Sequence, residues 1–230
     1  MKSPCGQVEG REERSLLSFR GIPFAASTAG DRRFRAPQPL APWQGVLDAR
    51  HFARASPQPV SRLRLLRRWS AVPRAGAGED CLNLNLWTPA ADAGRRPVLV
   101  WLEGGGFSHG SGSFPLYAGR GLAARGDAVV VTLNYRLGAL GGLDLRSFPG
   151  GESADTNLAL RDQIAGLEWV QSNIEAFGGN PDCVTSSASP RAPLMSSLRM
   201  NSTPGVFSPS VLSFSILWSS RPIFVSSISI

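Results

Sequence analysis

Residues 97–107 read Pro-Val-Leu-Val-Trp-Leu-Glu-Gly-Gly-Gly-Phe, and this stretch decides the fold expected for the 230-residue chain. The apolar run over residues 97–102 is short and continuous, which is typical of a strand buried on both faces of a parallel sheet. Three glycines follow at once, so the backbone can turn sharply and present its N–H groups without interference from side chains. A plain turn between a strand and a helix has the same pattern, so this segment alone leaves a catalytic and a structural interpretation open.

The sequence around this stretch predicts alternating strands and helices. Residues 128–134 form a second buried strand, and residues 84–88 form a weaker strand in which apolar and polar residues alternate. Residues 116–125 lie between the two buried strands and are expected to contain the crossover helix. With a further strand beginning at Val184, this order predicts an α/β protein with an open, mostly parallel sheet.

An amphipathic helix is predicted between the second buried strand and Val184. Its apolar positions recur at three- and four-residue steps, and they are Leu160, Ile164, Leu167, Val170, Ile174 and Phe177. Asp155 or Thr156 is expected to cap its start. The Gly-Gly pair at 178–179 should end it, and Pro181 prevents its continuation.

Composition restricts the partners that the chain can have. The net charge is +7, and the basic residues are nearly all arginine, Lys2 being the only lysine. No basic motif interleaved with aromatic residues and no zinc-ligand spacing accompanies this charge, so we expect no nucleic-acid partner. Residues 62–69 are the densest basic run and could form an amphipathic helix for anionic membranes, although a solvated surface segment is the simpler interpretation.

Neither the cysteines nor the apolar segments indicate a metal site, a disulfide framework or a membrane span. Cys5, Cys81 and Cys183 are odd in number and lack the spacing of metal ligands, so we expect no metal and no cofactor. No segment offers the ~20 uninterrupted apolar residues of a membrane-spanning helix. Residues 1–14 lack the apolar region of a secretory signal, which leads us to expect a cytoplasmic protein.

An ordered set of motifs surrounds the glycine turn. They are Phe-Arg-Gly-Ile-Pro-Phe-Ala at 19–25, Arg-Phe-Arg-Ala-Pro at 33–37, Trp43, Glu-Asp-Cys-Leu-Asn-Leu-Asn-Leu-Trp-Thr-Pro at 79–89, Asn-Tyr-Arg-Leu-Gly-Ala-Leu-Gly at 134–141, Asp162-Gln163 and Phe-Gly-Gly-Asn-Pro at 177–181. Over residues 7–185 this set resembles the type-B carboxylesterase family, which includes bacterial para-nitrobenzyl esterases and the cholinesterases.

The resemblance implies an α/β-hydrolase fold, of which this chain would hold the N-terminal part as an incomplete sheet. It also implies hydrolysis of a small-molecule carboxylic ester by a serine nucleophile, with an acidic residue and a histidine following in that order. By this likeness Gly105 and Gly106 would supply two N–H groups of the oxyanion hole, which stabilise the negative oxygen of the tetrahedral intermediate. The serine would lie a few residues past Thr185.

Several positions depart from the family pattern. Glu103 stands where His or Tyr is usual, and a carboxylate there would oppose the developing negative charge unless it points away or is protonated. Asn83 replaces Tyr, Thr or Phe, and Gly142 replaces Phe. Secreted relatives pair the cysteine matching Cys81 with one near the position of Ser56, so the serine implies that this bridge is absent.

The pattern breaks directly after Thr185. Residues 186–193 read Ser-Ser-Ala-Ser-Pro-Arg-Ala-Pro, which the codons TCT TCG GCG AGT CCG CGG GCG CC can encode. One G placed in front gives Val-Phe-Gly-Glu-Ser-Ala-Gly-Ala, a strand end followed by the G-x-S-x-G turn of the catalytic serine. We therefore predict a frameshift after Thr185 and a chain truncated before its nucleophile. Residues 186–230, with 15 serines and no acidic residue, are expected to be an out-of-frame or disordered tail prone to aggregation.

Two other serines imitate the nucleophile motif. Ser108 lies in Gly-Phe-Ser-His-Gly, but the residues after it cannot form the regular helix of a nucleophile elbow. Ser153 lies in Gly-Glu-Ser-Ala-Asp without a preceding strand and is expected to be a loop residue. His51 and His109 are the only histidines and both precede Thr185, so no base follows the expected serine and the chain as given is predicted to be inactive.

Two alternatives stay open at this point. The chain could be a non-catalytic binding or adhesion module, as some cholinesterase-like proteins without a triad are, and such a module would unfold cooperatively as a complete domain. It could instead be a hydrolase that uses Ser108, which the Ser108→Ala substitution would test.

Overall fold

A computed structural model describes residues 2–13, 15–59 and 72–188, together with the backbone of residues 197–200, 214–218 and 221–225. The basic run at 62–69 and most of the tail at 186–230 lie outside the described residues. No helix in the described ranges has the length and apolar character needed to cross a membrane.

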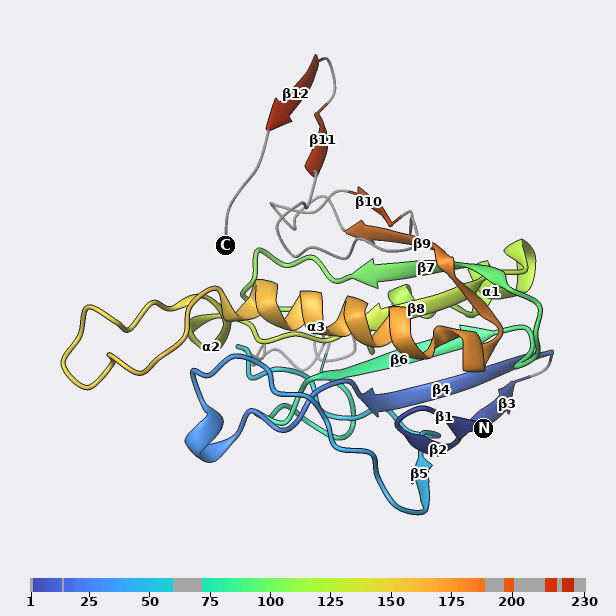
Figure 1. Ribbon diagram of the computed structural model, residues 1–230, viewed down its shortest axis with the longest axis horizontal. Helices are drawn as coiled ribbons and strands as arrows, with labels where there is room; N and C mark the ends of the chain where they lie inside the picture. The colour runs from blue at the N-terminus through green and yellow to red at the C-terminus, as the bar shows by residue number, and fades with distance from the viewer. Residues whose placement is uncertain are drawn as a thin grey trace, which may run out of the picture.

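Seven strands form the central sheet in the order β10-β9-β7-β8-β6-β4-β3 (Figure 1). Their bounds are β3 Arg11–Glu13, β4 Leu16–Pro23, β6 Asn83–Thr88, β7 Arg96–Leu102, β8 Val129–Leu133, β9 Gly179–Ala188 and β10 Ser197–Met200. β7 pairs in parallel with β8 and with β9, whereas every other neighbouring pair in this sheet is antiparallel. The predicted α/β fold is confirmed, but the prediction of a mostly parallel sheet is wrong, because parallel pairing is confined to the three strands β8, β7 and β9. Only two residues separate β3 from β4, and a connection this short permits antiparallel pairing only.

Smaller elements surround this sheet. β1 (Lys2–Ser3), β2 (Gly6–Glu9) and β5 (Val46–Asp48) form a three-stranded sheet, and β11 (Phe214–Trp218) pairs with β12 (Arg221–Val225). The short 3₁₀ helices are η1 (Gly30–Arg32), η3 (Pro115–Tyr117) and η4 (Ile174–Phe177).

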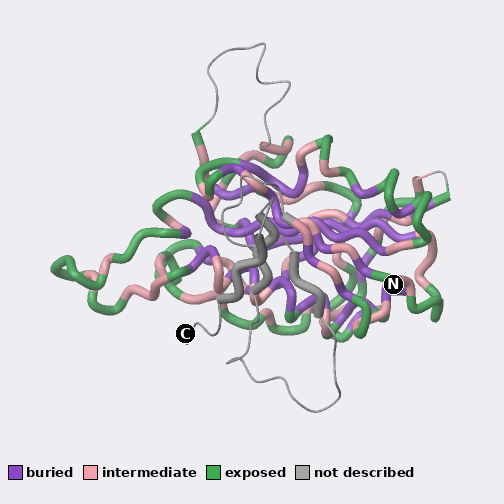
Figure 2. Tube along the Cα trace, turned by 90° about the horizontal axis from the view of Figure 1, so that it is seen from above, coloured by how far each residue is buried: buried purple, intermediate pink, exposed green. Residues whose placement is uncertain are grey.

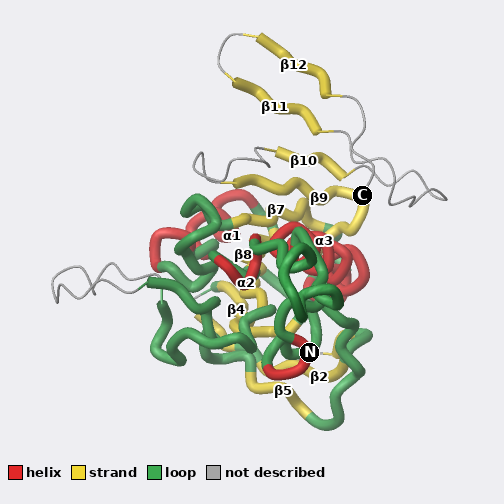
Figure 3. Tube along the Cα trace, turned by 90° about the vertical axis from the view of Figure 1, so that its left-hand side faces the viewer, coloured by secondary structure: helices red, strands yellow, loops and turns green. Residues whose placement is uncertain are grey.

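Helices cover both faces of the central sheet. α1 (Arg120–Gly126) connects β7 to β8, as predicted for residues 116–125, and α3 (Leu158–Asn173) leads through η4 into β9. α1 and α3 lie on opposite faces of the sheet in Figure 3. The short α2 (Ala139–Gly142) follows β8 and packs near α3. Gly166 brings α3 close to β8, because a Cβ on it would lie 2.9 Å from Leu133 Cδ1.

The buried face of α3 differs in part from the prediction. Leu167 and Val170 are buried as expected, but Leu160 and Ile164 are only half-buried. Asp162 and Gln163 take the buried positions instead. A purely apolar periodicity misses such a face, because a buried carboxylate is tolerated where a cation pairs with it.

The predicted cap of α3 is wrong, whereas the predicted stop is confirmed. Asn157 is the N-cap, in a left-handed conformation and without a side-chain capping bond. The carboxylate of Asp155 instead accepts a hydrogen bond from the backbone N–H of Ala36 at 2.7 Å. Gly178, at φ +81°, ends η4 in the left-handed conformation that favours glycine.

Burial of the strands also differs from the sequence-based expectation. β6, predicted to alternate, is buried along its whole length, because β4 and β8 flank it and α1 packs on it. β7, predicted to be buried on both faces, buries Val98, Val100 and Leu102 but leaves Leu99 and Trp101 half-exposed. Figure 2 shows the buried residues gathered through the middle of the molecule.

Candidate active site

The glycine turn at the carboxyl end of β7 has a backbone that only glycine tolerates at its centre. Gly105 has φ +154°, and a Cβ placed on it would lie 1.7 Å from the carbonyl oxygen of His109. Gly106 has φ +61° and open space around it. The backbone N–H of Ser108 donates to the carbonyl of Gly105 at 3.2 Å and closes the turn. Phe107 also has a positive φ, +56°, which is uncommon for an aromatic residue and marks local strain.

The N–H groups of Gly105 and Gly106 donate to no acceptor in the part of the chain that the structure describes. Gly105 is buried and Gly106 is exposed, so the two donors span the boundary between the protein interior and solvent. Backbone donors held in this way can bind an anionic oxygen without reorganising.

Residues from other elements hold the turn in place. The hydroxyl of Tyr135, just after β8, donates to the carbonyl of Glu103 at 2.6 Å. The Gly138 N–H donates to the carbonyl of Phe107 at 2.6 Å, and the Phe107 ring packs edge-on against Tyr135 with centroids 6.0 Å apart. The segments that follow the parallel neighbours β7 and β8 therefore support each other.

Gln58 holds the far end of the same loop. Its side-chain amide donates to the Gly110 carbonyl at 2.7 Å and accepts from the Gly110 N–H at 2.9 Å. No sequence motif indicated this role, because the contact joins residues 52 positions apart and depends on tertiary structure. The sequence likewise gave no role to Tyr135, although it lies within a quoted motif.

A buried amide network lies behind the loop and accounts for Asn83. The Asn134 amide donates to Asn83 Oδ1 at 2.8 Å, while Asn134 Oδ1 accepts from the Gly112 N–H at 2.8 Å. Asn83 Nδ2 donates to the carbonyl of Arg54 at 2.8 Å. The side chain that departs from the family pattern is thus satisfied on both its donor and its acceptor atoms. Gly142, the other departure, is exposed with no atom near its absent Cβ.

Glu103 lies beneath the turn and is only 1% exposed. Its Oε2 atom has no hydrogen-bond partner among the described residues. Burial raises the pKa of the Glu103 carboxyl well above its usual range. A neutral carboxylic acid places no full negative charge next to the glycine turn. Protonation was one of the two conditions, besides pointing away, under which Glu103 would not oppose a developing negative charge.

A buried ion pair fixes the segment after β8. Arg136 Nε and Nη2 donate to the two carboxylate oxygens of Asp162 at 2.8 Å and 2.6 Å, and both side chains are at most 2% exposed. The Arg136 backbone N–H also donates to Asp162 at 3.1 Å. Because the same segment carries Tyr135 and Gly138, this pair connects α3 to the support of the glycine turn.

The register of the sheet places the end of β9 beside the glycine turn. Ser186, Ser187 and Ala188 pair in parallel with Val100, Trp101 and Leu102, the last residues of β7. The residues immediately after Ala188 fall outside the described ranges. The first strand residues past the predicted break therefore lie beside the end of β7, at the edge of the sheet where the glycine turn begins.

The structure brings together one pair that the sequence did not predict. Ser108 Oγ lies 2.9 Å from His109 Nδ1 and 2.8 Å from the carbonyl oxygen of Gly105. Ser108 and His109 are both exposed. Ser153 is an exposed loop residue, as expected, and His51 is exposed as well.

Cys81 and Ser56 are neighbours, as the resemblance implied for the paired cysteines of its relatives. The Ser56 hydroxyl interacts with the Cys81 thiol and accepts a hydrogen bond from the Leu137 N–H at 3.0 Å. Burial raises the pKa of the Cys81 thiol to about 12, so it is an unreactive thiol. No cluster of metal-ligating side chains occurs within the described ranges.

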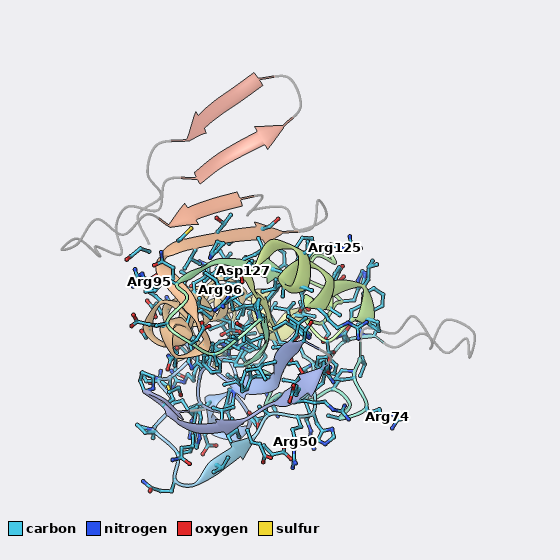
Figure 4. The ribbon with its side chains drawn as sticks, turned by 90° about the vertical axis from the view of Figure 1, so that its right-hand side faces the viewer. Arg50, Arg74, Arg95, Arg96, Arg125 and Asp127 are labelled. Carbon is cyan, nitrogen blue, oxygen red and sulfur yellow. The ribbon has the colours of Figure 1, made fainter. Side chains whose placement is uncertain are left out.

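Charged residues gather at the opposite, amino end of β7 (Figure 4). Arg95 pairs with Asp182 at 2.7 Å, and Arg96 pairs with Asp127 at 2.7 Å. These contacts bind the starts of β7 and β9 and the end of α1, so they stabilise the sheet at the edge remote from the glycine turn.

Comparison with known proteins agrees with this geometry. The profile of the carboxylesterase family matches residues 1–189. The chain belongs to the carboxylesterase family. It is similar to the para-nitrobenzyl esterase of Bacillus subtilis (strain 168), with 47% identity over 180 residues that cover 78% of this chain and 36% of that relative. It is also similar to the acetylcholinesterase of Bungarus fasciatus, with 43% identity over 74% of this chain and 28% of that relative.

Solved structures of family members support the α/β-hydrolase fold. A para-nitrobenzyl esterase structure superposes with a TM-score of 0.73 and 44% identity, covering 81% of this chain and 37% of that chain. The carboxylesterase Est55 of Geobacillus stearothermophilus gives a TM-score of 0.72 and 41% identity, covering 81% of this chain and 36% of that chain. The chain therefore spans little more than a third of the length of these relatives.

Proposed function

We propose that this chain carries the oxyanion-binding part of a carboxylic ester hydrolase and does not turn over esters by itself. The observation that supports the proposal most directly is the glycine turn beside the end of β9, where the Gly105 and Gly106 N–H groups have no acceptor among the described residues. The substrate class is a small-molecule carboxylic ester, as the names of the related esterases suggest.

The chemistry assigned to the turn is stabilisation of charge. Attack on an ester carbonyl converts its oxygen into an oxyanion, and each correctly placed N–H donor lowers the barrier by ~2.7–4 kcal/mol. Gly105 and Gly106 would supply two such donors, and the third would follow the nucleophile. Glu103 is compatible with this role in its neutral form, because only the ionised carboxylate would repel the oxyanion.

Inactivity in turnover follows from the residues that the chain provides. A serine needs an adjacent base to attack at neutral pH. Both histidines, His51 and His109, precede β9, so neither stands in the family's order after a serine at the end of that strand. The residues after Thr185 do not form the nucleophile motif in the frame as given.

The purified 230-residue chain tests the proposal directly. We expect no catalytic turnover of p-nitrophenyl acetate, which means no release of p-nitrophenol above the background rate beyond one equivalent per chain. Continued release that a serine-directed phosphonate abolishes would contradict the proposal.

The nucleotide sequence provides an independent test. Sequencing the transcript across codon 185, and reading several hundred bases beyond it in all three frames, should reveal the Val-Phe-Gly-Glu-Ser-Ala-Gly-Ala motif in a neighbouring frame. A transcript that lacks this motif in every frame would refute the frameshift hypothesis and favour a non-catalytic binding module.

A further inference from the structure

The exposed Ser108–His109 pair is the one nucleophile–base contact at the glycine turn that the family mechanism does not use. Ser108 Oγ lies within hydrogen-bond distance of His109 Nδ1, at 2.9 Å. This is the contact expected between a nucleophile and its general base. Adjacent side chains in a strand point to opposite faces. The left-handed conformations of Gly106 and Phe107 turn the chain just before Ser108 and His109, so these two adjacent side chains do not follow that alternation.

The Ser108 hydroxyl has two acceptors within reach. Its Oγ is 2.8 Å from the Gly105 carbonyl and 2.9 Å from His109 Nδ1, and a hydroxyl hydrogen rotates freely between such positions. When His109 carries its proton on Nε2, Nδ1 is an acceptor and can take the serine proton. Exposure of both side chains leaves the oxygen accessible to a dissolved reagent.

The backbone donors of the same turn are not aimed at Ser108. The peptide bond between Gly105 and Gly106 is trans, so the Gly106 N–H points away from the Gly105 carbonyl that Ser108 Oγ contacts. Gly105 is buried, whereas Ser108 is exposed. The groups that the structure offers for reaction at Ser108 are therefore the nucleophile and its base, which suits only an ester with a good leaving group.

We propose that Ser108 is an acyl-acceptor site for activated aryl esters. Ser108 Oγ attacks the ester carbonyl carbon while its proton passes to His109 Nδ1. The bond between the carbonyl carbon and the aryl oxygen then breaks, and the phenolate leaves with the electron pair. His109 returns the proton to the phenolate or to water, so the products are an O-acyl serine and a phenol.

Acylation should stop after one event per chain. A nitrophenolate is a far better leaving group than a serine alkoxide, so water attacks the acyl-serine much more slowly than the serine attacks the aryl ester. In addition, no carboxylate in the described part of the chain contacts His109, so the base lacks the third group that orients it in a triad. The inference goes beyond the proposed function, because it requires no residue after β9.

Mass spectrometry of the p-nitrophenyl acetate-treated chain tests the site. We expect one acetyl group on the peptide that contains Ser108, with His109→Gln lowering the labelling rate about 100-fold, the low end for a general base. Ser108→Ala should abolish the label on that peptide. Ser153→Ala is the matched control, since Ser153 is also an exposed loop serine followed by a non-helical turn, and it should leave Ser108 labelling unchanged.

The same experiment contains the outcomes that would overturn the proposal. Labelling of Ser108 no faster than that of Ser153, or equal labelling in the native and the urea-unfolded chain, would show that the folded pair has no special reactivity. An unchanged rate in His109→Gln would remove the base from the mechanism. Circular dichroism of each variant verifies that the exposed substitutions leave the fold intact. If the proposed function fails instead, p-nitrophenol release will continue beyond one equivalent per chain, and it will also do so in the Ser108→Ala variant.

Discussion

β7 and β9 are parallel neighbours that end at the same edge of the sheet, but their carboxyl ends differ in how the chain supports them. The loop after β7 is held by Tyr135, Gly138 and Gln58, three residues from two other segments. The end of β9 carries the small residues Ser186, Ser187 and Ala188, paired with β7 through the backbone.

In the proposed function this contrast separates the two halves of an acyl-transfer site. The proposed oxyanion donors are backbone groups, so glycines and the contacts that hold them are enough to build that half. The nucleophile half needs a particular side chain at a particular turn, and the frame as given supplies neither after Thr185. Substitutions that disturb the β7 loop should therefore cost more stability than substitution of the half-buried Ser187 at the end of β9.

The largest effect is expected at the buried ion pair beneath the loop. Asp162→Ala leaves Arg136 charged and unpaired in a buried position, which typically costs about 3–5 kcal/mol. Chemical denaturation should show this loss in the free energy of unfolding. Asp144→Ala is the control, because the Asp144–Arg146 pair is exposed and should change stability by less than about 1 kcal/mol. Equal effects of the two substitutions would contradict the role assigned to Asp162.

Gly105→Ala should be the next most destabilising change. The added Cβ would lie 1.7 Å from the His109 carbonyl oxygen at a φ that L-residues rarely adopt, so we expect a loss of about 3 kcal/mol. Gly121→Ala in α1 has open space and should gain about 0.5–1 kcal/mol. At the end of β9, Ser187→Ala should stay within about 0.5 kcal/mol. A mild Gly105→Ala phenotype in denaturation curves would remove the asymmetry between the two strand ends.

Glu103→Gln should stabilise the protein at neutral pH and change how its stability depends on pH. The Glu103 pKa is raised by burial, so the folded state holds this proton more tightly than the unfolded state. Stability from this group is therefore greatest below the unfolded pKa and decreases as pH rises toward the folded pKa.

The expected gain from Glu103→Gln is about 1–3 kcal/mol at pH 8, because glutamine is neutral at every pH, whereas Glu103 must bind a proton or be buried as an anion. The difference between the two proteins should shrink as the pH is lowered toward 4. Denaturation curves of both proteins at several pH values measure this difference in the free energy of unfolding. A difference that is independent of pH would mean that Glu103 titrates normally in the folded state.

The part of the site that sequence predicted is the part determined locally. The Gly105–Gly106 turn, the buried strands and the Gly178 stop depend on backbone preferences and short-range apolar patterns. The contacts of Gln58 and Asp155 could not be predicted in this way, because partners 52 and 119 positions away in the sequence determine them. The Asp155 carboxylate was expected at the start of α3, but the Ala36 N–H competes for it.

The burial of the strands also depended on contacts between segments that are far apart in the sequence. The alternation in residues 84–88 suggested a half-exposed strand, yet β6 is buried along its whole length. α1 packs against it, and Leu84 and Leu86 join the core cluster that also contains Val170 of α3. The polar residue Asn85 of β6 tolerates burial because its amide donates to Thr132 Oγ1 at 3.0 Å and accepts from the Gly21 N–H at 2.9 Å. Sequence periodicity reports the polarity of a strand, but the segments that pack on each face of the sheet decide whether the polar face meets water.

The smallest effect is expected from the hydroxyl that connects the two loops. Tyr135→Phe removes the hydrogen bond to the Glu103 carbonyl while keeping the ring that packs on Phe107, so we expect a loss of about 1 kcal/mol. Tyr117, the only other tyrosine, donates no hydrogen bond to a described residue, and Tyr117→Phe is therefore the matched control with no expected change. Thermal or chemical unfolding of the two variants isolates the contribution of one hydrogen bond. If both variants unfold alike, the segment after β8 supports the glycine turn through packing and backbone contacts rather than through this hydroxyl.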